Sequence, residues 1–379
     1  MAAADAPAAL PPEIALVVRR QRGAVRTLRA EGVVLPLLLL ALMLGSLALD
    51  GGVRTPVAVL LALVPIPLVA AVLVRLDRFE PEPARLILRT FLWGAGAATF
   101  VALIVNTLVG SLAGDDVATV VSAPVVEETA KALALVFVLR KRPGFLDGVH
   151  DGIVYAAWVA LGFATVENVL YYLQAWADDG VGGMTATFAL RGLMLPLCHP
   201  IFTAMTGIGI GIAVSRHWGR GGLIAGFLGG LAVAIALHAL WNGSTLLGGV
   251  GVAILFGYLP LAAIGIALLI GGARRERRIL RRGLQPELER GTIDEAEYAL
   301  LTSGGRVRAR LHRRARKAGR EARLMVYQYE ASAYELAHAN AQGRRRERPD
   351  PEASKTAFRG CLAEAQARLR GEWPGVIPA

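Results

Sequence analysis

The sequence has few cysteines and few charges: two cysteines in 379 residues, and charged residues at only 19%. Cys198 falls in an apolar segment and Cys361 in a basic C-terminal region, so they lie in different compartments and cannot pair. The sequence therefore gives no indication of a disulfide framework. Hydrophobic residues reach 54%, and the mean hydropathy of +0.48 is high for a soluble protein. These values indicate a membrane protein.

Long apolar runs predict an all-α, polytopic membrane protein. A helix needs about 20 mostly apolar residues to cross the hydrocarbon core of a bilayer. Eight segments meet this requirement, at roughly 33–50, 57–76, 88–112, 117–139, 150–176, 188–215, 222–247 and 249–271. The predicted parts are an N-terminal cytoplasmic segment at 1–32, a membrane domain of about eight spans at 33–272, and a basic helical tail at 273–379.

The positions of Lys and Arg near the span ends predict the orientation. Twenty of these residues fall on one side of the membrane, and two, Arg54 and Arg191, fall on the other. An even number of spans then places both termini on the basic, cytoplasmic side. A signal peptide is the alternative for residues 1–50, but the charged region before the first apolar run is about 30 residues long, which exceeds a normal n-region.

The composition changes after residue 272. Residues 273–379 carry 24 Lys and Arg against 14 Asp and Glu, which is +10 of the chain's net charge of +11. We expect a basic helix, a break at Gly283, a short helical hairpin, and disorder in "AQGRRRERPDPEAS". Basic segments that follow a span bind anionic lipid head groups, and these are the expected partner of the tail. Nucleic-acid binding is disfavoured, because no recognised binding motif accompanies the charge.

Ionisable side chains inside the predicted spans are few, and they recur from span to span. They are Glu127, Glu128 and Lys131 in the fourth span, Glu167 in the fifth, His199 in the sixth, and His238 in the seventh, with Asn242 on the same helix face as His238. Counted from the outer end of each helix, each of these four spans brings a carboxylate or an imidazole to a depth of about 12–17 Å. A charge within a span costs about 2.5–3.5 kcal/mol on insertion scales. The shared depth therefore indicates one buried functional site.

Taken singly, these residues also have structural explanations. A lone histidine such as His199 is often a packing residue bonded to a carbonyl group. Glu127 and Lys131 are four residues apart and could neutralise each other, but this pair leaves Glu128 without a partner. Cys198 is expected to fill space, because no pattern marks it as a nucleophile.

Glutamate and histidine in a buried cavity are suited to hydrolysis. A carboxylate takes a proton from water, and an imidazole or an amide stabilises an oxyanion or holds a metal. The signatures H-E-x-x-H, G-x-S-G and G-x-G-D are absent from the sequence, which disfavours site-2 zinc, serine and aspartyl mechanisms. A proton-coupled transporter is the alternative from another class, although the sequence shows no internal repeats of the kind that transporters usually have.

Four segments of the sequence, "VVEETAK", "GFATVENVLYY", "HPIFTAMTG" and "HALWN", resemble the E-E-x-x-K, F-x-x-x-E-N and H-x-x-x-N elements of the PrsW family of intramembrane proteases. "RLDRFEPEPARLI" is similar to the D-x-x-E-x-E-P segment of that family. The resemblance covers roughly residues 75–245. The family is distantly similar to type II CAAX prenyl endopeptidases, but Glu167 stands where those enzymes have histidine.

The resemblance implies hydrolysis of peptide bonds in membrane-anchored proteins of the bacterial cytoplasmic membrane, often an anti-sigma factor. It implies that Glu127 and Glu128 supply the general base and its partner, and that Lys131 tunes their charge. Glu167, His199 and His238 would complete the site, with Asn242 supporting His238 or an oxyanion. Another membrane hydrolase, such as a CAAX-like endopeptidase, is the alternative within the enzymes.

A metal is the last expectation from the sequence. Two imidazoles and the carboxylate of Glu167 converge at one depth, and His with carboxylate is a ligand set suited to Zn²⁺ with one position left for water. The expected ligands are thus Glu167, His199 and His238. A mechanism driven by glutamate alone stays open, because it needs only a carboxylate and donors around the oxyanion.

Overall fold

The computed structural model describes residues 33–77, 82–141, 145, 146, 148–246, 248, 251, 254, 258–303, 305–342 and 351–378. Within these ranges all regular elements are helices, and no strand occurs. The chain divides into a membrane unit at residues 27–267 and a second unit that includes the tail at 268–379. The predicted N-terminal segment 1–32 lies outside the described residues.

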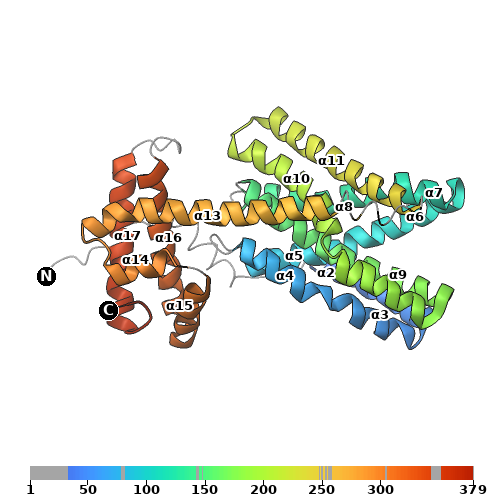
Figure 1. Ribbon diagram of the computed structural model, residues 1–379, viewed down its shortest axis with the longest axis horizontal. Coiled ribbons are helices and arrows are strands. Elements are labelled where there is room, and N and C mark those ends of the chain that lie inside the picture. The colour runs from blue at the N-terminus through green and yellow to red at the C-terminus, as the bar shows by residue number, and fades with distance from the viewer. Residues whose placement is uncertain are drawn as a thin grey trace. The chain divides into compact units, whose positions relative to one another are not determined.

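Between residues 33 and 246, the described part of the membrane unit forms α-helices with three π-helical stretches (Figure 1). Its elements are α2 (Val34–Gly51), α3 (Arg54–Leu63), α4 (Pro65–Leu76), α5 (Ala84–Leu92), η2 (Trp93–Ala98), α6 (Thr99–Ala113), α7 (Asp115–Val117), η3 (Ala118–Ser122), α8 (Ala123–Lys141), α9 (Val149–Thr187), η4 (Phe188–Met194), α10 (Cys198–Ser215) and α11 (Arg220–Leu246).

Five helical stretches of this unit are long and apolar enough to cross a membrane, which agrees with the predicted all-α polytopic membrane protein. They are Val34–Gly51, Arg54–Arg75, Ala84–Ala113, Val149–Ser215 and Arg220–Leu246. The fourth stretch is 67 residues long, far more than the roughly 20 that one crossing requires. It contains non-helical backbone at Asp179 and Gly180 and a break between η4 and α10.

The predicted count of eight spans stays a prediction. The helix α8 coincides with the fourth predicted span, but its three clustered ionisable residues keep it out of the five apolar stretches. The last predicted span, 249–271, lies partly outside the described residues.

The helix α9 packs against α10, η2, α3 and α5. Glycines allow the closest of these contacts. A Cβ atom on Gly152 would lie 2.1 Å from the carbonyl oxygen of Gly207 on α10, and one on Gly162 would lie 2.0 Å from that of Phe91 on α5. Small residues let helix backbones approach closely in a membrane. The position of α9, which carries Glu167, is thus fixed from two sides.

The D-x-x-E-x-E-P segment connects α4 and α5 to α9. Asp77 accepts a hydrogen bond from the backbone N–H of Glu82 at 2.8 Å, and the Tyr155 hydroxyl on α9 donates to the carboxylate of Glu82. The described part of this segment therefore stabilises the helix arrangement. Residues 78–81 lie outside the described residues.

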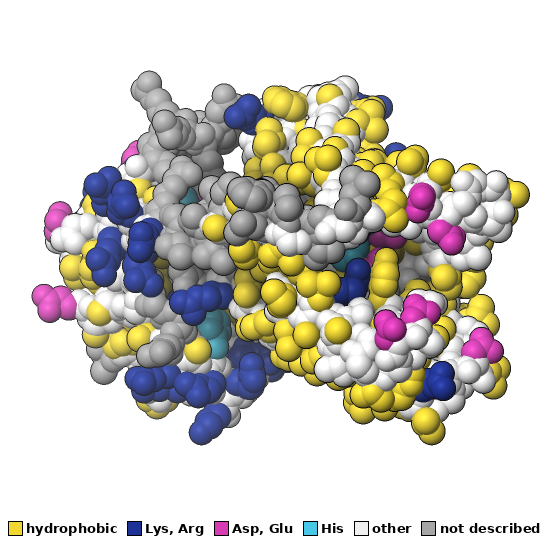
Figure 2. Space-filling view, turned by 45° about the vertical axis from the view of Figure 1, so that its right-hand side comes forward, with side chains coloured by type: hydrophobic (Ala, Val, Ile, Leu, Met, Phe, Trp, Pro, Cys, Tyr) yellow, Lys and Arg dark blue, Asp and Glu magenta, His cyan; other side chains and the backbone are white. Residues whose placement is uncertain are grey.

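Large apolar side chains cover much of the membrane unit's surface. Leu38 on α2 is 61% exposed, Leu60 on α3 is 66% exposed and Leu240 on α11 is 70% exposed. Figure 2 shows hydrophobic side chains spread over these helices, whereas Lys and Arg gather over the helices of the tail. An outward apolar surface of this extent is suited to contact with lipid tails.

The tail unit contains α13 (Leu259–Glu289), whose C-terminal part belongs to it, α14 (Glu295–Leu301), α15 (Gly305–Ala318), α16 (Arg320–Gln342) and α17 (Pro351–Glu372). Leu284, Tyr329, Leu336, Phe358 and Leu362 are fully buried and form part of its core. The tail therefore folds around its own hydrophobic core.

Two expectations about the tail need correction. The break predicted at Gly283 is wrong, because α13 continues through it to Glu289. Glycine is required there for packing rather than for a turn, since a Cβ atom would lie 2.0 Å from the carbonyl oxygen of Ala337 on α16. Of the segment predicted to be disordered, residues 341–342 and 351–354 are helical, and residues 343–350 lie outside the described residues.

A buried carboxylate connects three helices of the tail. Glu287 on α13 is fully buried and accepts two hydrogen bonds from Arg359, both at 2.8 Å. It also accepts hydrogen bonds from Asn340 at 2.9 Å and from Thr292 at 3.0 Å. Burial alone would raise the pKa of Glu287, but these donors outweigh it and lower the pKa to about 2. The ionised form thus stabilises the tail.

Candidate active site

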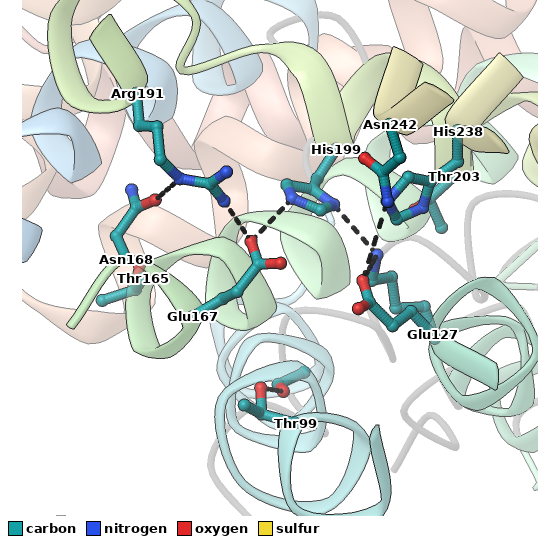
Figure 3. Close-up of polar contacts among 12 residues, drawn as sticks. Thr99, Glu127, Thr165, Glu167, Asn168, Arg191, His199, Thr203, His238 and Asn242 are labelled. Carbon is teal, nitrogen blue, oxygen red and sulfur yellow. Dashed lines mark hydrogen bonds and ion pairs between the residues drawn. The ribbon is translucent and has the colours of Figure 1, made fainter. Parts of the chain in front are cut away.

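Six of the seven predicted site residues lie in one buried network between α8, α9, α10 and α11 (Figure 3). The seventh, Asn242, lies nearby but has a different partner. Its side-chain amide donates to the backbone carbonyl of Thr119 in η3 at 2.8 Å. Asn242 therefore holds α11 against η3, and the expected support of His238 is not what its amide provides.

Glu128 is the best-bonded carboxylate of the network. It is fully buried, and it accepts hydrogen bonds from Lys131 Nζ at 2.8 Å and from the Thr203 hydroxyl at 2.7 Å. His238 Nδ1 lies 3.1 Å from the same carboxylate. A carboxylate only accepts, so Nδ1 carries the proton and the Nε2 atom of His238 keeps its lone pair.

Lys131 is fully buried in the centre of the network. Its Nζ lies 3.5 Å from Glu127 Oε2 and 3.0 Å from His199 Nδ1, and it sits 3.9 Å from the ring centroid of Phe163. An ammonium group only donates, so Nδ1 of His199 accepts and its Nε2 carries the proton. Phe163 therefore packs against a cation, a favourable arrangement for an aromatic face.

Glu167 lies on the other side of His199 and is paired with an arginine that the sequence analysis placed outside the site. Its Oε2 accepts from His199 Nε2 at 2.8 Å and from Arg191 Nη2 at 2.5 Å. Arg191 also donates to Asn168 Oδ1 at 2.9 Å, and its guanidinium lies 3.8 Å from the ring centroid of Tyr171. These contacts fix the orientation of Glu167 and, through it, that of His199.

In the sequence, Arg191 was counted only as a basic residue at an outer span end, and the structure shows that its side chain belongs to this network. The signal was present in the sequence, because Arg191 interrupts the apolar stretch of η4, where an unpaired charge is costly.

A second missed residue is Asn106 on α6. Its amide lies 3.4 Å from Glu127 Oε1, and its carbonyl oxygen accepts from Ser122 at 2.8 Å.

Glu127 differs from its neighbour in having an oxygen without a donor. The residue is buried, and its Oε2 atom makes no hydrogen bond. The Nε2 atom of His238 faces this oxygen at 3.9 Å. Two atoms with free lone pairs, a carboxylate oxygen and an imidazole nitrogen, therefore face each other inside the unit.

The group suited to a metal contains Glu127 rather than the expected Glu167. Single ligand atoms of Glu127, His199 and His238 all lie within 4.8 Å of one another. Ligands of a tetrahedral zinc, at about 2.0–2.2 Å from the ion, are separated by about 3.3–3.6 Å. The 3.9 Å between Glu127 Oε2 and His238 Nε2 needs only a small closure, and the oxygen makes no hydrogen bond, although Lys131 Nζ lies 3.5 Å from it. These two residues fit a metal, whereas both nitrogens of His199 are engaged by Lys131 and Glu167.

The start of α10 positions His199. The chain is non-helical from Leu195 to Leu197, and His199 is the second residue of the new helix. The structure shows a full break before α10, and Pro196 lies within it.

Two cavities reach the network. A groove of about 520 Å³ is bordered by the α2–α3 connection, α6, Glu127 and α9 from Phe163 to Ala177. The 14 helical steps from Phe163 to Ala177 give the groove a length of about 21 Å, which matches about six residues of an extended chain. A small cavity of about 40 Å³ is lined by His199, His238 and Asn242. Glu167 borders both cavities.

Comparisons with known proteins point in the same direction. Residues 82–269 match a family model described as PrsW family intramembrane metalloprotease. The chain is 34% identical over 139 residues to Protease PrsW of Geobacillus kaustophilus, a match covering 36% of this chain and 58% of that protein. It is 31% identical over 141 residues to Protease PrsW of Bacillus subtilis, covering 36% of this chain and 60% of that protein.

The chain thus matches about three fifths of the length of these two relatives. No solved structure matches it at a comparable level of significance. The tail from residue 270 onward lies outside the matched family segment, while every residue of the glutamate–histidine network lies inside it. Over residues 82–269, about half of its length, the chain is similar to the PrsW family.

Proposed function

We propose that this protein is an intramembrane peptidase that hydrolyses peptide bonds of membrane-anchored proteins. One observation carries the proposal. The carboxylate of Glu127 has an oxygen without a hydrogen-bond donor, it borders the 520 Å³ groove, and it lies beside two imidazoles. Such a carboxylate is placed to take a proton from a water molecule that enters from the groove.

The two adjacent glutamates have different tasks in this mechanism. Glu127 is the general base, because its Oε2 atom is free to accept a proton. Glu128 holds Lys131 and the protonated Nδ1 of His238, so that His238 Nε2 points its lone pair towards Glu127. On the other side, Glu167 keeps His199 in a fixed orientation.

A divalent metal is proposed as a cofactor, with Glu127, His199 and His238 as its ligands. The description of the matched family supports it, as does the unbonded Oε2 atom of Glu127 opposite His238 Nε2. Bound zinc would lower the pKa of its water towards about 7. Glu127 as ligand and Glu127 as base are alternatives for the same oxygen.

The proposed substrate is a protein anchored in the bacterial cytoplasmic membrane, with an anti-sigma factor as the expected class. The groove supports this, because it runs along α9 for a length of about six extended residues and is bordered by both Glu127 and Glu167. Both termini of the protease are proposed to be cytoplasmic, in keeping with the basic residues at the predicted span ends.

The tail is proposed to contact anionic lipid head groups. Helix α15 exposes Arg310, Arg313, Arg314, Arg316 and Lys317, while Leu311 and Ala315 are buried in the tail's core. A cluster of exposed basic residues binds anionic head groups by charge. Hydrogen exchange of α15 should therefore slow in nanodiscs with anionic lipid and stay unchanged in zwitterionic ones.

The experiment compares cells that express wild-type protein, Glu127→Gln or Asp116→Asn. The last variant is the matched control, since it also neutralises one carboxylate, but at an exposed position of α7. Membrane proteomics should find a substrate that is cleaved with wild type and with the control and accumulates uncleaved with Glu127→Gln. We expect cleavage to fall at least about 100-fold, the usual contribution of a general base. Identical cleavage in all three strains would refute the proposal.

A further inference from the structure

Lys131 occupies the space that a metal ion would need. Its Nζ atom lies 3.0 Å from His199 Nδ1 and 3.5 Å from Glu127 Oε2, and these are two of the three residues of the candidate metal group. We infer that Lys131 is the resident cation of this site, and that a divalent ion binds there only when the ammonium group of Lys131 leaves His199.

The engagement of His199 supports this inference. Its Nε2 atom donates to Glu167, which Arg191 holds in place. Its Nδ1 atom accepts from Lys131. Figure 3 shows Glu167 and Glu127 on opposite sides of the His199 ring. The nitrogen on the Glu127 side is Nδ1, so a metal between Glu127 and His199 takes the place of Lys131.

The formal charge of the network leads to the same result. Glu127, Glu128 and Glu167 contribute three negative charges, and Lys131 and Arg191 contribute two positive ones. With neutral imidazoles the network carries one net negative charge. A divalent ion added beside Lys131 would leave a net positive charge in a buried site, where repulsion at about 4 Å is strong. With Lys131 removed, as in a Lys131→Met variant, the network carries two negative charges, which a divalent ion balances.

Several contacts keep Lys131 in this position. Besides His199 and Glu127, it contacts Glu128 at 2.8 Å and the ring of Phe163 at 3.9 Å. It can release His199 and still keep Glu128, so exchange with a metal does not require the loss of all its partners. The inference concerns the metal part of the proposed function and does not depend on the peptidase activity.

The test measures the affinity of purified protein in detergent for Zn²⁺, by competition with a chromogenic chelator. The decisive pair is Glu128→Gln and the double variant Glu128→Gln/Lys131→Met. Both lack the Glu128 charge, and the double variant removes both members of a buried pair, which folded proteins tolerate better than loss of one member. Both keep Glu127, His199 and His238. We expect the double variant to bind zinc at least tenfold more tightly.

Two further variants locate the effect. Adding His238→Ala to the double variant should abolish the gain in zinc affinity, and Glu128→Gln/Lys131→Arg, which retains a cation, should bind zinc like Glu128→Gln alone. Equal zinc affinity of Glu128→Gln and the double variant, or no zinc binding by either, would overturn the inference. A gain that survives His238→Ala would overturn it as well. Cleavage by wild-type protein is measured separately, so failure here leaves the proposed hydrolysis standing.

Discussion

Replacing Arg191 by methionine tests whether the network depends on the ion pair between Arg191 and Glu167, which does not include Glu127. Arg191 Nη2 lies 2.5 Å from Glu167 Oε2, and the two side chains are only 22% and 12% exposed. Glu167 also accepts from His199 Nε2. Without the arginine, Glu167 becomes a buried carboxylate that has lost its charged partner, and His199 loses its fixed support.

The expected coupling free energy follows from the geometry of the ion pair. Two unit charges about 4 Å apart interact by about 4 kcal/mol at an effective dielectric constant of 20. Partial exposure of Arg191 reduces this value, so we expect a coupling free energy of about 2–3 kcal/mol between Arg191 and Glu167. The single variant Arg191→Met should lose more stability than this, because it leaves one buried charge unpaired. Cleavage should fall about 10- to 100-fold, as it does when a residue that orients a functional histidine is removed.

The assay is a double-mutant cycle with Arg191→Met, Glu167→Gln and the combined variant, measured by thermal unfolding in detergent and by cleavage. The combined variant should be more stable than the sum of the two single losses predicts. Arg216→Met is the control, since Arg216 is an exposed arginine at the end of α10 that borders neither cavity. Additive losses of stability, with a coupling below about 0.5 kcal/mol, would refute the role assigned to the pair.

Three other predictions follow from the groove, the tail and the charge distribution. Thr107→Trp should fill the groove and lower cleavage at least about tenfold, whereas Leu108→Trp, exposed beside it and outside the groove, should not. Glu287→Gln should destabilise the tail by about 2 kcal/mol at pH 7 relative to the control Glu289→Gln, as measured by hydrogen exchange. Because the pKa of Glu287 is lowered from 4.5 to about 2 in the folded tail, this difference in stability should be full above pH 4.5 and vanish as the pH falls towards 2. A cysteine at Asp115 should react with an impermeant reagent from outside the cell, and protection there would contradict the proposed topology.

The sequence was sufficient to predict the helical membrane architecture and that six ionisable residues of the spans lie together. Apolar runs predict spans directly, because the bilayer requires about 20 apolar residues for each crossing. The cost of burying charge explains why the six ionisable residues of the spans meet, since each needs partners. The same cost indicates that Arg191 also needs a charged partner. We counted it as an outer residue because it lies near the end of a predicted span.

The sequence was not sufficient to predict which residues touch. Depth along a helix can be counted, but the direction of a side chain around the helix axis depends on tertiary packing. Glu127 and Glu167 lie at similar predicted depth, and the structure places them on opposite sides of His199. For this reason we expected Glu167 in the candidate metal group, whereas the structure has Glu127 there. The partner of Asn242 was missed for the same reason, because Thr119 contributes a backbone carbonyl that no sequence pattern marks.

The structure also explains why two consecutive glutamates are useful in a membrane helix. Consecutive residues of an α-helix point about 100° apart, so they meet different surroundings. Glu128 points towards Thr203, Lys131 and His238, and these donors occupy both of its oxygens. Glu127 borders the groove, and its Oε2 atom makes no hydrogen bond. A carboxylate surrounded by donors is a poor proton acceptor, and an isolated buried carboxylate is costly. Two adjacent carboxylates meet these two requirements separately. Glu128 binds the ammonium group of Lys131, which keeps Glu127 in place, and Glu127 stays available for chemistry.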